Sequence, residues 1–176
     1  SIHKNGKIND EKKLLYYGSK GKRINALSKN QNKFVDSCAH NDIVFVIGPA
    51  GTGKTFLSVV LAVKALKEKI IEKIVITRPV VEAGENLGFL PGDLQDKINP
   101  YLRPIYDSLD EILPKKKIKQ FIDNGIIEIV PLAYMRGRTL KNSYILLDEA
   151  QNTVSSQIKM FLTRMGKNSK MIITGD

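Results

Sequence analysis

The sequence predicts an α/β fold in which a parallel sheet carries helices on both faces. Short β-branched apolar runs alternate with longer helical segments along residues 28–176, which is typical of βαβ units. Polar or glycine residues follow these runs directly, among them Gly48, Arg78 and Asp148. Parallel sheets bind ligands beyond the carboxyl ends of their strands. We therefore expect these residues to form one site at one edge of the sheet.

The apolar patterning also predicts where each element lies. We expect strands at residues 43–47, 73–77, 126–130, 144–147 and 170–174, and helices at residues 28–39, 56–67, 98–113, 115–123 and 155–165. The run at 43–47 is short and β-branched, which favours a buried strand. Ser28 precedes the first helix as a potential N-cap. Repeated glycine and proline between residues 79 and 92 predict a long connection.

Size and composition exclude several classes of protein. The 176 residues are the length of one domain, with 42% hydrophobic and 26% charged residues. No apolar run approaches the roughly 18 residues that a membrane span needs, and residues 1–13 lack the apolar core of a signal peptide. The single cysteine, Cys38, cannot form an internal disulfide. We therefore expect a cytoplasmic protein without a membrane partner.

The net charge of +10 is concentrated near the start of the chain. Residues 1–33 hold nine lysines and arginines against two acidic residues, which leaves about +3 for the other 143 residues. We expect residues 1–27 to form a basic arm, or a small flanking element, ahead of a domain at 28–176. Such an arm can recruit a polyanion by counterion release. A solvated, lysine-rich leader would have the same composition, so both interpretations stay open.

Residues 48–55 (GPAGTGKT) fit the phosphate-binding pattern G-x-x-x-x-G-K-[ST] between a predicted strand and a predicted helix. The candidate nucleotide-binding residues are Gly48, Pro49, Ala50, Gly51, Thr52, Gly53, Lys54 and Thr55. The backbone N–H groups of such a loop surround phosphates, and the helix adds its positive dipole end. Lys54 would reach the β- and γ-phosphates, and the Thr55 hydroxyl would bind Mg²⁺. The fold class is therefore a P-loop NTPase (RecA-like) sheet, with ATP and Mg²⁺ as cofactors.

Two carboxylates follow the strand predicted at 144–147. Asp148 can hold Mg²⁺ through its water shell, and Glu149 can act as general base toward the attacking water. The alternative is that the pair only caps the next helix electrostatically. Gln31 lies 17 residues before the loop, and a carboxamide matches the N6 and N7 edge of adenine. The alternative for Gln31 is an ordinary surface residue.

Several stretches in fixed order resemble the PhoH family. They are residues 30–31 (NQ), 47–55 (IGPAGTGKT), 76–84 (ITRPVVEAG), 87–96 (LGFLPGDLQD), 135–140 (MRGRTL), 147–152 (LDEAQN) and 173–176 (ITGD). The resemblance implies an ATP-binding, phosphate-starvation-linked protein similar to the ATPase core of superfamily 1 helicases. It also implies RNA or another single-stranded nucleic acid as a partner.

The resemblance assigns roles to individual residues. It makes Gln31 the adenine reader, the loop at 48–55 the Walker A motif and Asp148 with Glu149 the Walker B pair. Gln151 and Asp176 resemble helicase sensors of the γ-phosphate. Residues 77–79 resemble a nucleic-acid contact that would use Arg78. Two further candidate contacts with a strand or phosphate are Arg136 and Arg138, for which a solvated loop is the alternative.

The sequence departs from the family pattern at its end. Family members continue past the Thr-Gly-Asp motif, whereas these residues stop there. We expect the strand at 170–174 to lie between those at 43–47 and 144–147, with an outer strand and an arginine finger missing. The domain is therefore expected to be incomplete at its C-terminus, with a homo-oligomer able to supply the finger in trans.

Three functions remain possible on these residues. The preferred one is an ATPase that hydrolyses ATP in dependence on nucleic acid, helicase-like in type. A nucleotide-gated binding module with little hydrolysis is the second, because the finger is absent. A thymidine-kinase-like phosphotransferase is the third, since such proteins carry Asp-Glu-Ala-Gln after a strand. The single cysteine argues against their zinc site.

Overall fold

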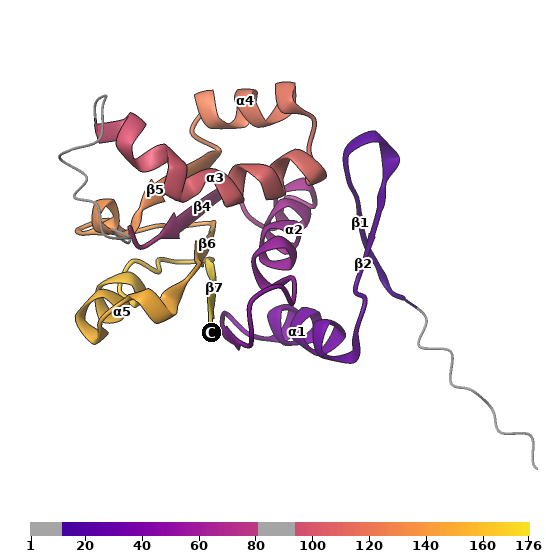
Figure 1. The fold of residues 1–176 in the computed structure, drawn as a ribbon, viewed down its shortest axis with the longest axis horizontal. Helices are drawn as coiled ribbons and strands as arrows, with labels where there is room; N and C mark the ends of the chain where they lie inside the picture. Colours follow the sequence, from indigo (N-terminus) through magenta and orange to yellow (C-terminus); the bar gives the residue numbers. More distant parts are fainter. Residues whose placement is uncertain (1–11, 81–93) are drawn as a thin grey trace, which may run out of the picture.

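The computed structural model describes residues 12–80 and 94–176 and has an α/β architecture (Figure 1). Its elements in chain order are β1 (Leu14–Tyr17), η1 (Ser19–Gly21), β2 (Arg23–Asn25), α1 (Lys29–His40), β3 (Ile43–Ile47), α2 (Lys54–Lys67), β4 (Lys73–Arg78), α3 (Leu94–Ile112), α4 (Lys115–Asp123), β5 (Ile127–Pro131), η3 (Leu132–Met135), β6 (Ser143–Leu147), η4 (Ala150–Asn152), α5 (Ser155–Leu162) and β7 (Lys170–Gly175). Much of the predicted long connection at 79–92 lies outside the described residues.

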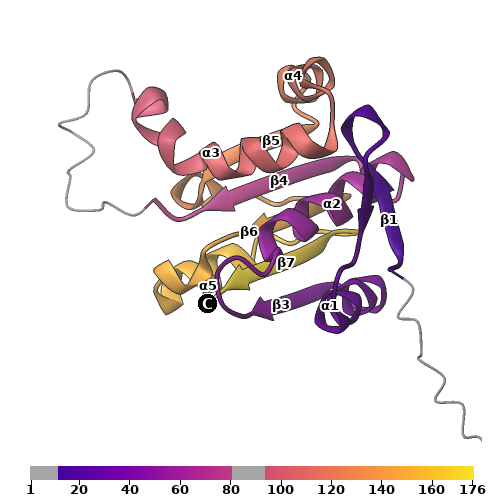
Figure 2. The same cartoon turned by 45° about the vertical axis from the view of Figure 1, so that its right-hand side comes forward.

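Five strands form one parallel sheet in the order β3-β7-β6-β4-β5 (Figure 2). The predicted position of β7, between β3 and β6, is confirmed. Val44 of β3 is opposite Ile172 of β7, and Ile76 of β4 is opposite Leu146 of β6. Because all five strands run the same way, their carboxyl ends meet at one edge, where the predicted site residues follow them.

Alternation along the central strands divides the core into two layers. Ile74 and Ile76 of β4 face α1 to α4, whereas Val75 between them belongs to the cluster around α5 and η3. Successive strand residues point to opposite faces of a sheet, and both faces of β4 are buried. The prediction of helices on both faces is therefore confirmed. Among the described helices, none is both long and apolar enough to cross a membrane.

The prediction that the strand at 43–47 is buried is wrong for one of its faces. The side chains of Ile43, Phe45 and Ile47 are 41%, 55% and 78% exposed. Val44 and Val46, which point the other way, are partly buried against the larger cluster. The physical reason is that β3 is an edge strand among the described residues, so apolar composition alone did not reveal its position in the sheet.

Local signals explain how α1 and α2 begin. The Ser28 hydroxyl accepts a hydrogen bond from the Gln31 N–H at 3.1 Å, which confirms the predicted N-cap. Helix α2 begins at Lys54, two residues earlier than predicted, directly after Gly53 in the left-handed region. Its residues Leu57, Val60 and Val63 pack into the core, so the start of α2 is held firmly at the edge of the sheet.

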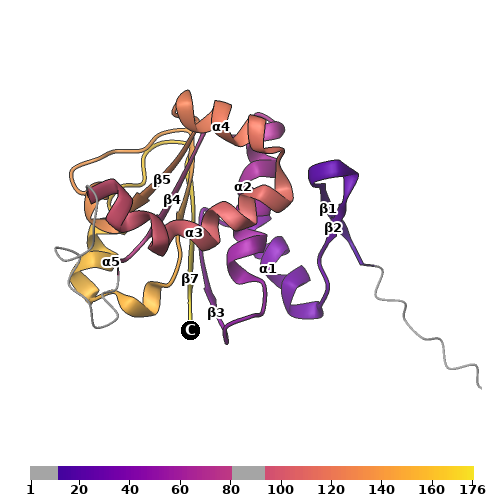
Figure 3. The ribbon, with the colours of Figure 1, turned by 45° about the horizontal axis from the view of Figure 1, so that its top comes forward.

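Part of the predicted basic arm is an ordered hairpin. Strands β1 and β2 pair antiparallel, and the hairpin lies beside α2 (Figure 3). Leu15 and Ile24 are each only 4% exposed. A side chain at Gly18 would come within 2.7 Å of the Glu111 carbonyl oxygen, so the hairpin approaches the end of α3 closely. Residues 1–11 lie outside the described residues, and the division at residue 27 stays a prediction.

Candidate nucleotide and metal site

The loop between β3 and α2 has the backbone shape that phosphate binding needs. Gly51 and Gly53 have φ angles of 79° and 81°, a region that glycine adopts without steric cost. The Thr52 hydroxyl donates a hydrogen bond to the Pro49 carbonyl at 2.9 Å, which closes the turn. The N-terminal end of α2, with its unpaired N–H groups and positive dipole end, follows immediately.

Lys54 lies at the centre of the loop. Its ammonium group donates to the carbonyl oxygens of Gly48 and Pro49, the latter at 2.8 Å. It also forms an ion pair with Asp176 at 3.3 Å. Only 13% of the Lys54 side chain is exposed, so its ammonium group lies inside the loop that precedes α2 and not in the solvent. Asp176, predicted as a sensor of the γ-phosphate, therefore lies next to the predicted phosphate-binding lysine.

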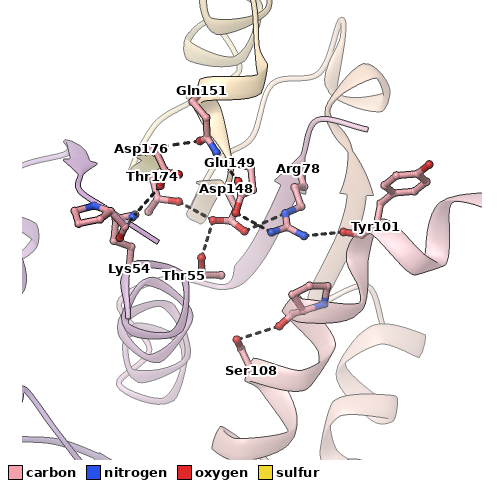
Figure 4. Close-up of polar contacts among 12 residues, drawn as sticks. Lys54, Thr55, Arg78, Tyr101, Ser108, Asp148, Glu149, Gln151, Thr174 and Asp176 are labelled. Atoms are coloured by element: carbon pink, nitrogen blue, oxygen red, sulfur yellow. Dashed lines mark hydrogen bonds and ion pairs between the residues drawn. The ribbon is translucent and has the colours of Figure 1, made fainter. Parts of the chain in front are cut away.

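Asp148 joins three elements at the carboxyl edge of the sheet (Figure 4). Its Oδ1 accepts hydrogen bonds from Thr55 Oγ1 at 2.7 Å and from Thr174 Oγ1 at 2.8 Å. Its Oδ2 is buried without a hydrogen-bond partner among the described residues. A hydroxyl and a carboxylate at this distance fit Mg²⁺, which takes one or two protein oxygens and keeps several waters. The Oδ2 atom, which accepts no hydrogen bond from the described residues, is suited to accept one from such a water.

Glu149 has an unusual backbone and two side-chain partners. Its φ is 58°, in the left-handed region, where a non-glycine residue costs of order 1–3 kcal/mol and often marks a functional site. Its Oε1 lies 2.9 Å from an Arg78 nitrogen, and its Oε2 accepts from Gln151 Nε2 at 2.5 Å. The Gln151 Oε1 in turn accepts from the Asp176 N–H at 3.3 Å. The predicted base and sensors therefore form one connected set.

Arg78 lies within this site. Its guanidinium pairs with Glu149 and also with Asp148 Oδ2 at 3.2 Å. The second contact is an ion pair without hydrogen-bond alignment, because both Arg78 Nε and Asp148 Oδ2 lack a hydrogen-bond partner among the described residues. A third nitrogen donates to the Tyr101 carbonyl at 3.0 Å. Arg78 thus bridges both carboxylates to α3, which the spacing of the sequence did not reveal.

Gln31 lies beside the loop at a second cavity of about 240 Å³. Its Nε2 donates to the Thr52 carbonyl at 3.1 Å, and its Oε1 accepts from the Leu27 N–H at 2.6 Å. A carboxamide has two donor hydrogens and two acceptor positions, so one of each remains. Phe34 and Val46 add apolar surface to this cavity, which suits a flat heterocycle.

The main cavity of the site has a volume of about 260 Å³ and is lined by the loop, by Asp148, Glu149 and Gln151, and by the end of β7. Sequence reasoning missed Thr174, which holds Asp148, and Pro104 and Ser108 of α3. The position of Thr174 just before Gly175 was an available signal. No local signal placed α3 over the site, because its contact with the loop depends on tertiary packing.

The structure does not bring the other two predicted arginines into this set. Arg138 donates to both carboxylate oxygens of Glu128, at 2.7 and 2.8 Å. Lys73 pairs with the same carboxylate at 2.8 Å. These contacts, led by the Arg138 hydrogen bonds, lower the pKa of Glu128 from 4.5 to about 2. Arg136 is exposed at the end of η3, and its predicted role stays open.

The fold and the loop define the class of this protein. A parallel sheet of order β3-β7-β6-β4-β5, with a glycine-rich loop between β3 and a helix, is a P-loop NTPase fold. A solved structure agrees on the fold, the Sulfolobus solfataricus SWI2/SNF2 ATPase core in complex with dsDNA. It superimposes with a TM-score of 0.60 at 16% identity and covers 92% of this chain and 33% of that one.

The chain belongs to the PhoH-like protein family, whose model matches residues 23–176. It is 60% identical over 158 residues to the PhoH-like protein of Bacillus subtilis, covering 90% of this chain and 50% of that protein. Identity to the PhoH-like protein of Synechocystis is 52%, over 94% of this chain and 51% of that protein. Identity to protein PhoH of Escherichia coli is 44%, over 87% of this chain and 44% of that protein. The chain thus spans about half the length of these relatives.

Proposed function

We propose that this domain binds ATP with Mg²⁺ and hydrolyses it to ADP and phosphate, in dependence on RNA or another single-stranded nucleic acid. The observation that carries the proposal is the convergence of four side chains from the ends of two elements that lie far apart in the sequence. Lys54 and Thr55 begin α2, and Asp148 and Glu149 follow β6, yet Thr55 and Asp148 are 2.7 Å apart. Phosphoryl transfer depends mainly on such positioning and on charge stabilisation.

Each residue has a defined task in this reaction. The Lys54 ammonium group and the loop N–H groups neutralise the phosphates. Thr55 Oγ1 and Asp148 would hold the Mg²⁺ ion and its water shell, and the ion would stabilise the charge that develops on the phosphate oxygens. Glu149 accepts a proton from the attacking water on a carboxylate oxygen. The water oxygen forms a bond to the γ-phosphorus while the bond from that phosphorus to the ADP oxygen breaks, which releases ADP and phosphate. Gln151 and Asp176 orient Glu149 and Lys54.

The Gln31 carboxamide supports adenine as the base. It stands beside the apolar surface of Phe34 and Val46 at the edge of the loop, with one donor hydrogen and one acceptor position remaining. Adenine offers the complementary pair at N6 and N7.

Nucleic acid is supported by separate observations. The SWI2/SNF2 neighbour was solved with dsDNA, although that likeness concerns the fold alone. Residues 1–33 also carry nine basic side chains against two acidic ones, which favours a polyanionic partner. We further propose a cytoplasmic protein that assembles as a homo-oligomer, in which a neighbouring subunit supplies an arginine finger.

The test is ATP turnover by this chain, with and without single-stranded RNA. Glu149→Gln should retain ATP while hydrolysis falls by about 10²–10⁴, the range for a lost general base. Lys54→Ala should lose ATP binding as well, because it removes the cation between the phosphates. Full turnover in Lys54→Ala would refute the site, and equal loss of binding in Glu149→Gln would make Glu149 structural.

One observation favours a second function, a nucleotide-gated binding module with little hydrolysis. Each Glu149 oxygen already has one partner, Arg78 on Oε1 and Gln151 on Oε2. These contacts stabilise the ionised carboxylate and make it a weaker base toward the attacking water. Nucleotide-dependent RNA binding without ATP turnover would assign this function instead.

A further inference from the structure

We propose that the groove between the β1–β2 hairpin, the end of α2 and the start of α4 binds single-stranded nucleic acid by stacking its bases. This groove is separate from the nucleotide site, and the inference rests on the proposed nucleic-acid partner. It gives that partner a place on the molecule which neither the loop motifs nor the family resemblance assigns.

The groove lies at the edge of the sheet opposite the nucleotide site. It is a cavity of about 610 Å³, larger than the cavities of about 260 and 240 Å³ at the nucleotide site, and its walls are more apolar than polar. Glu72 and Ile126, which line it, stand immediately before β4 and β5. The nucleotide loop and Asp148 stand at the carboxyl ends of the strands. Residues of the hairpin line one side of the groove. The hairpin lies next to the junction of α3 and α4 (Figures 1 and 3).

Aromatic rings come to the groove from two separate elements. Tyr16 and Tyr17 belong to β1, and Phe121 belongs to α4. Tyr17 is 55% exposed, whereas Leu15, two residues earlier on the same strand, is only 4% exposed. An exposed ring adds little to the stability of the core, but its flat face is available for stacking with a base. Base–aromatic stacking is the main sequence-independent contact in single-strand binding.

Lysines accompany these rings. Lys67 lies over Tyr16 with 5.2 Å from Nζ to the ring centroid, and Lys117 lies over Phe121 at 4.8 Å. Lys20 at the hairpin tip also lines the groove. Among the described residues, none of these three lysines has a carboxylate within salt-bridge distance. Glu72 is the acidic residue in the lining, so the groove is net positive.

This combination favours nucleic acid over an acidic peptide. Both partners would satisfy the lysines, but the exposed Tyr17 ring, beside the partly buried Tyr16 and Phe121 rings, matches a ligand that presents flat bases between its phosphates. Positively charged grooves with stacking rings are the common solution for single strands. Helix α2 joins the two sites directly, with Lys54 at its start and Leu66 and Lys67 at its end.

The test measures binding of a fluorescent oligouridylate of about 12 nucleotides, a length within the range of one single-strand site. Binding is measured without nucleotide, across a salt series. Tyr17→Ala should weaken affinity about tenfold, the effect of losing one stacked base. Lys117→Ala should lower the slope of log affinity against log salt by about 0.7, the value for one phosphate contact on a single strand.

Matched controls are available on the other face of the sheet. Tyr134 is an exposed ring in η3, and Lys159 is an exposed lysine in α5. Tyr134→Ala and Lys159→Ala should change affinity less than twofold. Equal effects of Tyr17→Ala and Tyr134→Ala, or none from either, would overturn the proposal. So would tighter binding of a poly-glutamate peptide that Tyr17→Ala abolishes, because the groove would then be a peptide site.

The outcomes also separate this inference from the proposed ATPase. Tyr17 and Lys117 lie outside the nucleotide site, so basal ATP turnover should be unchanged in both variants. A protein that shows no turnover, yet loses oligonucleotide affinity in Tyr17→Ala, would refute the ATPase and keep the groove. A protein with RNA-stimulated turnover but no effect of Tyr17→Ala would keep the ATPase and refute the groove.

Discussion

Replacement of Glu128 by glutamine should destabilise the fold and make its stability less dependent on pH. The Glu128 carboxylate accepts two hydrogen bonds from Arg138 and forms an ion pair with Lys73. The Glu128 side chain is 27% exposed. These contacts hold its pKa at about 2, down from 4.5. At about 1.4 kcal/mol for each tenfold change in acidity, this difference corresponds to at most roughly 3.5 kcal/mol of folding free energy, and partial exposure of the side chain lowers it.

The sign of the pH dependence follows from the lowered pKa. The unfolded chain binds a proton at Glu128 near pH 4.5, whereas the folded chain does so only near pH 2. The stabilisation is therefore complete above about pH 5 and is lost as the pH falls toward 2.

The assay is urea unfolding of wild type and Glu128→Gln between pH 7 and pH 3. The difference in unfolding free energy should be about 2–3 kcal/mol at pH 7 and should shrink steadily below pH 4.5. A difference that does not change with pH would refute the reasoning.

The same pair tests the predicted nucleic-acid role of Arg138. Arg138→Ala should lower stability by a similar amount, because it leaves a partly buried carboxylate without its main partner. It should leave RNA affinity nearly unchanged, since its guanidinium is bonded to Glu128. Arg136→Ala, which removes an exposed arginine two residues away, should leave stability unchanged and is the matched control. Weaker RNA binding at unaltered stability in Arg138→Ala would restore the predicted contact.

Three further predictions concern single side chains. Gln31→Ala should narrow the preference for ATP over GTP, measured by competition, because it removes the donor and acceptor beside the base cavity; unchanged selectivity would make Gln31 a helix-capping residue only. Arg78→Gln should raise basal ATP turnover roughly tenfold by releasing a charge-assisted contact to Glu149, and lower turnover would instead give Arg78 a direct role in catalysis. Cys38 should resist thiol reagents at pH 8 in the folded protein, because burial raises its pKa to about 11; rapid labelling without unfolding would contradict its burial.

Much of the nucleotide site could be predicted from the sequence because its signals are local. The loop at 48–55 needs glycines at positions of positive φ, and Gly51 and Gly53 have them. The Ser28 cap depends on a residue only three positions away. Apolar runs with a polar residue after them placed Asp148 and Glu149 at the end of β6. Each of these features is decided within a few residues, so the chain itself carries the information.

Other features depend on packing between distant residues, and the tertiary structure decided them. Arg78 bonds to Glu149, 71 residues further along, whereas its sequence context indicated a nucleic-acid contact. The β1–β2 hairpin is ordered because Leu15 and Ile24 pack into the core, whereas the basic composition of residues 1–27 indicated an arm.

The strand at 43–47 shows the limit of composition most directly. An apolar, β-branched run reports that a segment prefers a sheet, but not whether it lies at the centre or the edge. Burial of its second face depends on what the rest of the fold places against it. The sequence by itself therefore determined the fold class, the loop and the carboxylate pair, whose conformations follow from neighbouring residues. Only the tertiary structure decided which cation meets which carboxylate and which apolar face is covered, because those depend on long-range contacts.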